Sequence, residues 1–469
     1  MAAVRPFSLI KSGHTMTLRS LQSFVFDVET LSHEGRGVAR FGPFHDHPQE
    51  LHGKKIFIEG CLPGERVRAT ISQHHERFSE GQLIEVVEAT HERVTPPCPV
   101  YERCGGCTLQ HLSVPAQLAH KSHVLADQLK RFGSGLPYFF AEAKSSDQAH
   151  YRARIRLGVA HAPNFHVGYR AKHSHELVDA ASCYVAQEKL SALIALITQR
   201  AEKFRLPALS SLSEVLFDAG DSSCAVTLVL SKDSAANELE RVATLLNTEG
   251  MEKVLTPLQT ALWIKQGRTL RQLFGPHLSY ELPEFTCRVD FEPGDFTQAN
   301  RQLNQVLVGE AMRLLELQEG ETLLDLFSGL GNFSLPAARL VGDSGHVIGI
   351  EGSTVMTERA RLNAKQSGLS QRCEFLALDL HKPFAARLKN RRIDAVLVDP
   401  PRSGAKAVMK ELLTLKPKRI MYVSCNPATL ARDSALLMNA GYTFEYAQAF
   451  DMFTHSSHAE ALSLFRLTA

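Results

Sequence analysis

Residues 323–333 combine an apolar run with a turn that contains two glycines: Leu323-Leu324-Asp325-Leu326-Phe327-Ser328-Gly329-Leu330-Gly331-Asn332-Phe333. Glycine at these two positions allows the main chain to turn tightly and to lie close to a ligand. Glu351 ends the next apolar run, 20 residues after Gly331, where a carboxylate can accept both hydroxyls of a ribose. The stretch therefore predicts a buried strand followed by a turn that binds a nucleoside-containing ligand.

Four further apolar runs are separated by segments with helical spacing. They cover residues 347–351, 375–379, 395–399 and 420–424. Strands that are apolar throughout and alternate with helices form parallel sheets covered on both faces, which predicts a Rossmann-like α/β domain. Ligands of such sheets bind beyond the carboxyl ends of the strands. Polar residues follow at these ends: Asp325, Glu351, Asp379, Asp399 and Cys425.

The glycine turn distinguishes two classes of ligand. A dinucleotide site has the pattern G-x-G-x-x-G, whose amides hold a pyrophosphate, and residues 329–334 do not follow this pattern. Acidic strand ends also suit a cationic sulfonium better than a diphosphate. We therefore expect a methyltransferase that uses S-adenosylmethionine, and a dinucleotide-dependent enzyme is the alternative.

Cys425 lies at the end of the fifth run, in Ser424-Cys425-Asn426-Pro427, and a cysteine there is often only a small buried side chain. Its place beside the expected donor site indicates a nucleophile instead. Glu460 supplies a carboxylate just before the final apolar run. C5 of uracil accepts a methyl group only after a thiolate has added to C6, and a base must then remove the C5 proton. We expect Cys425 to be the nucleophile and Glu460 to be the base.

The order of these motifs resembles that of RNA uracil-C5 methyltransferases. The resemblance covers residues 285–469 and rests on Phe296-Thr297-Gln298-Ala299-Asn300, the turn at 325–333, Asp399-Pro400-Pro401-Arg402, the Cys425 motif and residues 455–460. It implies the same catalytic roles for Cys425 and Glu460. It also implies that six residues line the methyl donor: Gln298, Phe327, Asn332, Glu351, Asp379 and Asp399. Relatives often carry asparagine at the position of Asp379.

Four cysteines are spaced in a way that is typical of metal ligands: Cys98, Cys104, Cys107 and Cys183. Three of them crowd one loop, and the fourth follows 76 residues later. Zinc usually binds two C-x2-4-C pairs, so the crowded loop favours a 4Fe-4S cluster. The cluster of a radical S-adenosylmethionine enzyme is held by three cysteines and has one open iron. Four cysteine ligands leave no iron open, so we do not expect such an enzyme. The remaining cysteines outside the catalytic motif are expected to pack in cores: Cys61, Cys224, Cys287 and Cys373.

The N-terminal part alternates short β-type runs with turns. Runs at 21–28, 55–58, 67–72 and 82–87 predict a small OB-like barrel over residues 17–90. Residues 31–40 resemble the TRAM domain, an RNA-binding barrel, whereas a β module that only packs on its neighbours is the alternative.

A helix is expected after Ser113, with apolar positions at Leu118, Leu125, Leu129 and Phe132. The predicted chain is multidomain: a tail at 1–16, the barrel at 17–90, an α+β central domain with the iron-sulfur cluster at 91–284, and the methyltransferase domain at 285–469.

Positive charge is concentrated at residues 151–180, which carry five basic and two acidic residues and four histidines. Arg152, Arg154 and Arg156 alternate, so that in a strand they share one face. We expect this face to contact RNA phosphates, with a merely solvated face as the alternative. Within the family, a TRAM domain joined to the cysteine pattern is typical of enzymes that modify 23S ribosomal RNA, which implies that substrate. A tRNA methyltransferase and a non-catalytic RNA-binding redox sensor are the alternatives.

The 469 residues include 52 basic and 50 acidic side chains, a formal net charge of +2, and 44% are hydrophobic. This composition excludes disordered, collagen-like and uniformly basic proteins. No apolar run reaches the roughly 18 residues of a membrane span, and residues 1–20 lack the apolar stretch of a signal peptide. We therefore expect a cytoplasmic monomer without membrane contact whose nine cysteines are reduced. Residues 1–15 are expected to be a loose tail or an over-long start before Met16.

Overall fold

The computed structural model describes residues 23–468 except 44, 45, 134, 180, 181, 233, 234, 236, 247 and 390. The predicted tail and the first residues of the predicted barrel lie outside this range. The chain forms two compact units. One comprises the N-terminal part up to Pro97 with Cys107–His120 and His455–Ser457, and the other comprises Cys98–Gly106, Lys121–Thr454 and the chain from His458 onward. The three-domain division stays a prediction. No helix in the described part of the chain has the length and apolar character that a membrane crossing requires.

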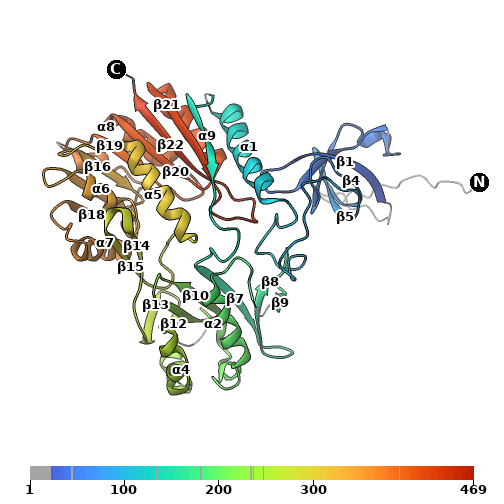
Figure 1. The fold of residues 1–469 in the computed structure, drawn as a ribbon, viewed down its shortest axis with the longest axis horizontal. Coiled ribbons are helices and arrows are strands. Elements are labelled where there is room, and N and C mark those ends of the chain that lie inside the picture. The colour runs from blue at the N-terminus through green and yellow to red at the C-terminus, as the bar shows by residue number, and fades with distance from the viewer. Residues whose placement is uncertain are drawn as a thin grey trace, which may run out of the picture. The chain divides into compact units, whose positions relative to one another are not determined.

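The first unit contains a closed five-stranded barrel, drawn in blue in Figure 1. Its order is β1-β2-β3-β5-β4, with β1 (Ser23–Leu31), β2 (Gly37–Arg40), β3 (Lys55–Glu59), β4 (Arg66–His74) and β5 (Phe78–Glu88). Fully buried Phe26, Ile56 and Ile58 fill the interior. The predicted barrel is thus confirmed, and β2 is the strand for which the sequence shows no separate apolar run.

Helix α1 (Val114–Phe132) begins after Ser113, whose hydroxyl accepts the Ala116 amide at 3.4 Å. Leu125 and Leu129 are fully buried, as the helical spacing predicts. Phe132, the last of these apolar positions, is 61% exposed. It is the last residue of the helix, where the apolar face ends.

The second unit contains a seven-stranded sheet of order β13-β12-β11-β10-β7-β8-β9, green in Figure 1. The strands are β7 (Arg154–Ala160), β8 (His166–Arg170), β9 (Leu177–Val178), β10 (Leu212–Ala219), β11 (Cys224–Leu230), β12 (Thr260–Gln266) and β13 (Thr269–Phe274). The helices of this part are α2 (Glu188–Gln199), α3 (Glu238–Leu245) and α4 (Thr248–Leu255). They contribute to one hydrophobic core with the sheet.

An eight-stranded sheet of order β18-β17-β16-β19-β20-β22-β21-β6 forms the C-terminal part of this unit. The strands are β6 (Phe139–Lys144), β16 (Thr322–Leu326), β17 (His346–Glu351), β18 (Cys373–Ala377), β19 (Ala395–Val398), β20 (Arg419–Ser424), β21 (Tyr442–Phe450) and β22 (Glu460–Leu467). The five strands predicted from apolar runs pair in parallel, which confirms the Rossmann-like sheet. β22 is antiparallel to β20 and β21.

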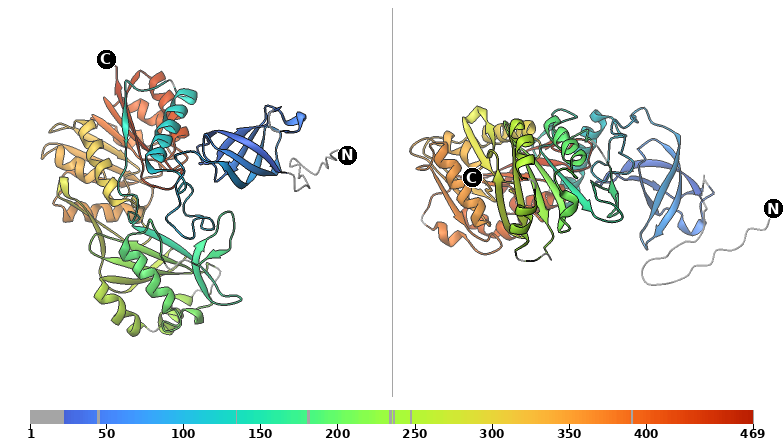
Figure 2. Two further views of the ribbon diagram at one scale, coloured as in Figure 1. Left: turned by 45° about the vertical axis from the view of Figure 1, so that its right-hand side comes forward. Right: turned by 90° about the horizontal axis from the view of Figure 1, so that it is seen from below.

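Two separate cores cover the two faces of this sheet, because residues on each strand point alternately to either side. Leu323 and Leu397 pack in the core with α5 (Arg301–Leu315), α6 (Ser334–Leu340) and α7 (Thr354–Gln366). Leu324 and Val398 pack in the core with α1, α8 (Lys406–Leu415) and α9 (Pro427–Asn439). Figure 2 shows these helices around the sheet in two further views.

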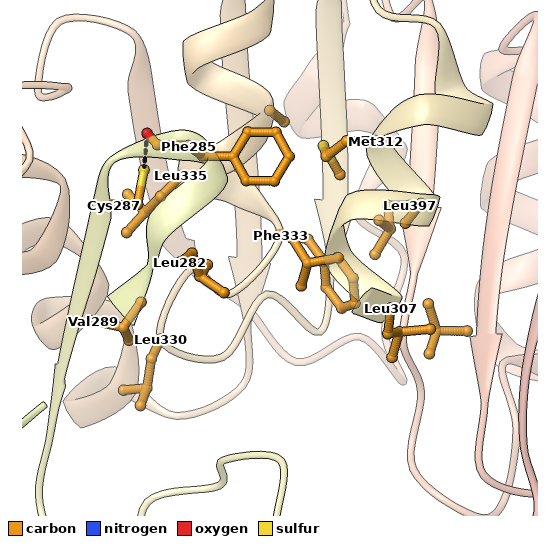
Figure 3. Close-up of a cluster of buried hydrophobic side chains, with 14 of the residues drawn as sticks. Leu282, Phe285, Cys287, Val289, Leu307, Met312, Leu330, Phe333, Leu335 and Leu397 are labelled. Carbon is orange, nitrogen blue, oxygen red and sulfur yellow. Dashed lines mark hydrogen bonds between the residues drawn. The ribbon is translucent and has the colours of Figure 1, made fainter. Parts of the chain in front are cut away.

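A hairpin of β14 (Leu278–Leu282) and β15 (Cys287–Phe291) closes the first of these cores. Figure 3 shows Leu282, Phe285 and Val289 of the hairpin region together with Leu307 and Met312 of α5. Cys287 is buried here and donates to the Phe285 carbonyl at 3.3 Å. Cys61 and Cys224 are also buried, and Cys373 is half-buried.

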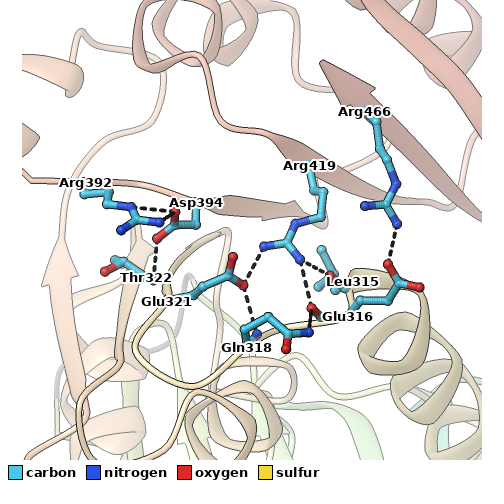
Figure 4. Close-up of polar contacts among 9 residues, drawn as sticks. All are labelled: Leu315, Glu316, Gln318, Glu321, Thr322, Arg392, Asp394, Arg419 and Arg466. Atoms are coloured by element: carbon cyan, nitrogen blue, oxygen red, sulfur yellow. Dashed lines mark hydrogen bonds and ion pairs between the residues drawn. The ribbon is translucent and has the colours of Figure 1, made fainter. Parts of the chain in front are cut away.

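Polar contacts secure the amino ends of the parallel strands (Figure 4). Arg419 at the start of β20 donates to the carbonyls of Leu315 and Glu316 at 2.8 and 2.9 Å, and pairs with Glu321 at 2.5 Å. Asp394, just before β19, accepts the Thr322 amide of β16 at 3.1 Å. These contacts fix the edge of the sheet opposite to the carboxyl ends of the strands.

Candidate active site

The glycine turn after β16 has the backbone conformation that its sequence requires. Phe327, Gly329 and Gly331 have positive φ angles of 63°, 53° and 93°. Glu351, at the end of β17, braces the turn, since its carboxylate accepts the amide of Gly329 at 3.2 Å and that of Ser353 at 2.8 Å. Each carboxylate oxygen keeps a free lone pair for a ligand hydroxyl.

Gly349 in β17 lies against Ser328 of the glycine turn and against the Phe375 ring. A Cβ atom at this position would lie 2.5 Å from the Phe375 ring and 2.9 Å from Ser328 Oγ. A side chain at this position would therefore displace the turn.

Asn332 is turned toward neighbouring elements. Its carbonyl oxygen accepts hydrogen bonds from Tyr280 and Asn304, each at 2.9 Å, and its amide donates back to Asn304 at 3.0 Å. Asn304 is fully buried on α5. These bonds tie the turn to α5 and leave one amide hydrogen of Asn332 for a ligand, so its predicted contact with the donor stays a prediction.

The other predicted donor residues differ in exposure. Gln298 is buried, and Asp399 is half-buried directly after β19. Asp379 is exposed beyond β18, where the amide of His381 and Lys382 lower its pKa. Asp325 belongs to the same acidic group: burial first, and then Asp399 and Glu351, raise its pKa to about 7.

Cys425 and Glu460 lie side by side at the carboxyl end of β20. The last register pair of β20 and β22 is Ser424 with Ala461, and the next residue on each strand is Cys425 or Glu460. The two groups interact: burial, followed by the charges of Glu460 and Asp399, raises the pKa of Cys425 to about 11, while Arg402 acts in the opposite direction. Residues that are 35 apart in the sequence are thus brought together by one antiparallel pairing.

Glu460 is a buried carboxyl group, with only 4% of the residue exposed. Burial, followed by the charge of Asp399, raises its pKa to about 8, while Arg402 acts in the opposite direction. Arg402 is itself within 3.3 Å of the His458 ring, and its carbonyl accepts the side-chain amide of Asn426 at 3.0 Å. A carboxylate with a raised pKa is a stronger base than an exposed one.

Lys121 on α1 holds the chain just before Glu460. The Lys121 side chain is 1% exposed, pairs with buried Asp451 and donates to the Phe453 carbonyl at 3.0 Å. Tyr151 donates to the Thr454 carbonyl at 2.8 Å. Lys121 belongs to no motif, and the one signal for it was a lysine between Leu118 and Leu125 on the apolar side of the helix.

Comparisons with known proteins agree with this geometry. A model of the tRNA (uracil-5-)-methyltransferase family matches residues 113–466, and a TRAM domain model matches residues 27–84. The chain belongs to the RNA uracil-C5 methyltransferase family.

Two relatives from bacteria match this chain over nearly their full length. The 23S rRNA (uracil(1939)-C(5))-methyltransferase of Acinetobacter baylyi is 38% identical over 95% of this chain and 96% of its own. The enzyme of the same name from Psychrobacter arcticus is 36% identical over 96% and 91%. A crystal structure of the Pyrococcus abyssi tRNA (uracil-54, C5)-methyltransferase with S-adenosyl-L-homocysteine has a TM-score of 0.69 at 22% identity, and covers 94% of this chain and 99% of its own, which shows the shared fold.

The four cysteines predicted as cluster ligands are half-buried and form no disulfide. The main chain at Cys104 is bonded to the end of β8, through a bridge with Ala171 and the Gly105 amide to the Arg170 carbonyl at 2.9 Å. Burial raises the pKa of Cys104, and Cys183 and Cys98 raise it further. Cys107 belongs to the other compact unit. Within the described residues, no three His, Cys, Asp or Glu side chains form a ready metal-binding group.

Of the three alternating arginines at 152, 154 and 156, only Arg156 is exposed. Arg156 is 68% exposed and lies 3.6 Å from Glu214. Arg154 forms an ion pair with buried Asp218, and Arg152 lies over the Phe453 ring at 5.9 Å. The expectation that all three contact RNA phosphates is therefore wrong for Arg154, because its guanidinium binds Asp218 and the carbonyl of Asp295.

Proposed function

We propose that this chain transfers a methyl group from S-adenosylmethionine to C5 of one uridine in 23S ribosomal RNA. The observation that carries this proposal is the placement of Cys425 beside Glu460 at the sheet edge where Asp399 also lies. The curated relatives of that name, similar over nearly the whole chain, support this RNA as the substrate. The TRAM barrel supports RNA binding, and a ribosomal substrate places the reaction in the cytoplasm of a cell.

The residues at the donor end fit S-adenosylmethionine, which supplies the methyl group when bound. Glu351 can bind the ribose, and the glycine turn allows the main chain to lie against the ligand. Burial raises the pKa of Asp399 to about 7, and burial followed by the charges of Asp399 and Glu351 raises that of Asp325 to about 7, so negative charge is crowded around Asp325. A sulfonium cation relieves this crowding, whereas a diphosphate would increase it.

Cys425 and Glu460 act in different steps of the reaction on the uracil ring. The Cys425 thiolate adds to C6 of uracil, and the electron pair of the C5–C6 double bond becomes available at C5 to take the methyl group. Glu460 then removes the proton from C5. The double bond forms again, the carbon–sulfur bond breaks, and the sulfur leaves as a thiolate.

A 4Fe-4S cluster held by Cys98, Cys104, Cys107 and Cys183 is part of the proposal. Four cysteines outside any disulfide form a suitable donor set. The buried Tyr169 hydroxyl lies beside Cys183: burial first, and then the charge of Cys183 and a hydrogen bond to it, raise the pKa of Tyr169. This places a buried hydroxyl donor against sulfur. We also propose the three-domain division at residues 90 and 284, and a monomeric enzyme.

The test is methyl transfer in vitro from labelled S-adenosylmethionine to unmodified transcripts of 23S ribosomal RNA and of tRNA. We expect label in 23S RNA, recovered as 5-methyluridine after digestion. Label in tRNA alone would overturn the substrate and favour a tRNA enzyme. No transfer to either RNA by protein with its full iron content would favour a non-catalytic role.

A further inference from the structure

Arg154 connects the seven-stranded sheet to the segment that carries Gln298. It faces Asp218 across the antiparallel pair β7–β10, and the two side chains form an ion pair. Asp218 is 1% exposed, whereas Arg154 is 30% exposed. The guanidinium also donates from Nη1 to the carbonyl of Asp295 at 2.7 Å. One planar group therefore binds the sheet on one side and the start of the donor segment on the other.

The segment from Asp295 to Asn300 is held at both ends. At its far end, the Ala153 amide donates to the Ala299 carbonyl at 2.7 Å, and Arg152 bridges to Asn300. At its near end, the Asp295 side chain pairs with Arg359 of α7, in addition to the bond between its carbonyl and Arg154. Gln298 lies between these anchors.

We propose that Arg154, paired with Asp218, is a positioning residue for the methyl donor. It fixes the main chain at Asp295, and the main chain from there to Asn300 sets where Gln298 lies. This inference rests on the proposed function, in which Gln298 contacts S-adenosylmethionine. It replaces the role in phosphate binding that the alternating arginines suggested.

The chemistry of the side chain gives this proposal a specific form. A guanidinium presents several N–H donors in a fixed plane, so it can bind a carboxylate and a carbonyl at the same time. A lysine keeps the charge, but it is a point donor and cannot hold both partners in that geometry. The Arg154→Lys variant therefore keeps the positive charge at this position while it loses the simultaneous contacts with Asp218 and Asp295.

The experiment compares Arg154→Lys with Arg156→Lys in the full-length holoprotein. Arg156 lies on the same face of the same strand and is exposed, so its variant is the matched control. S-adenosyl-L-homocysteine affinity is measured by calorimetry, and RNA affinity is measured as a function of salt. We expect Arg154→Lys to lose about tenfold in affinity for the cofactor product, the size of one charge-assisted hydrogen bond. KM for the donor should rise more than kcat falls. The salt slope of RNA binding should stay unchanged, and Arg156→Lys should bind the cofactor product as the parent protein does.

Equal cofactor affinity of Arg154→Lys and the parent protein would overturn the inference. Failure of the parent protein itself to bind S-adenosyl-L-homocysteine would overturn the proposed function instead. If Arg154→Lys does not fold, the double variant Arg154→Met/Asp218→Leu removes both charges and leaves no unpaired buried carboxylate. It lacks the bond to Asp295, so it should show the same loss of affinity, and full affinity would again refute the role of Arg154.

Discussion

Replacing Glu460 by glutamine should stabilise the protein at alkaline pH, although it removes the proposed base. The pKa of this carboxyl is raised from an ordinary 4.5 to about 8, chiefly by burial. The folded state therefore holds the proton more tightly than the unfolded state. The cost of ionising the buried group is absent below pH 4.5, grows as the pH rises toward 8, and is complete above it. At about 1.4 kcal/mol for each pKa unit, the full cost is about 5 kcal/mol.

The assay is urea unfolding of the protein without ligands at pH 5 and pH 9. Glu460→Gln should be close to the parent protein at pH 5 and more stable by several kcal/mol at pH 9. Glu358→Gln, at an exposed position of α7, is the control and should change neither value. If Glu460→Gln is no more stable than the parent protein at pH 9, the claim that ionised Glu460 destabilises the folded state is refuted. On RNA, the same variant should accumulate a methylated covalent adduct, because the C5 proton is no longer removed.

RNA with 5-fluorouridine at the target should be methylated and then trapped on Cys425, because fluorine cannot leave as a cation; denaturing electrophoresis should show no such adduct for Cys425→Ala. Iodoacetamide should modify Cys425 slowly at neutral pH and faster toward pH 11, as measured by mass spectrometry. In Glu460→Gln the reaction should speed up at a lower pH, because the charge of Glu460 that raises the pKa of the thiol is gone. Protein purified without oxygen should contain about four irons per chain, and stoichiometric zinc without iron would contradict this. Lys121→Met should cost about 3–5 kcal/mol in urea unfolding, because Asp451 is left buried and unpaired, and adding Asp451→Asn should recover part of the loss.

Local patterns made the sheet and its polar edge predictable. An apolar run that ends in a polar residue marks a strand end, and parallel pairing brings consecutive strand ends to the same edge. Asp399 and Cys425 lie at this edge for that reason. Gly329 and Gly331 could be placed in a tight turn because glycine allows positive φ angles, whereas the positive φ of Phe327 has no signal in the sequence. The donor and catalytic roles of these residues stay predictions that the placement supports.

Contacts between distant segments could not be predicted in the same way. An alternating pattern tells which residues share a face of a strand, but not what covers that face. Arg154 binds partners 64 and 141 residues away, and Lys121 binds one 330 residues away. A charged residue in such a pattern looks the same whether it faces water or a buried carboxylate. The partner becomes known only when the topology of the whole unit is known.

The coupling between Cys425 and Glu460 also orders the steps of the proposed reaction. Each group in its ionised form opposes ionisation of the other, so the thiolate forms most readily while Glu460 is protonated. Addition to C6 converts the thiolate into a neutral thioether, which removes one negative charge from beside Glu460. Glu460 therefore ionises more readily after the addition than before it, and in its ionised form it is the base that the next step needs. Nucleophile and base are therefore active in turn, and the change of charge at sulfur switches the site from one to the other.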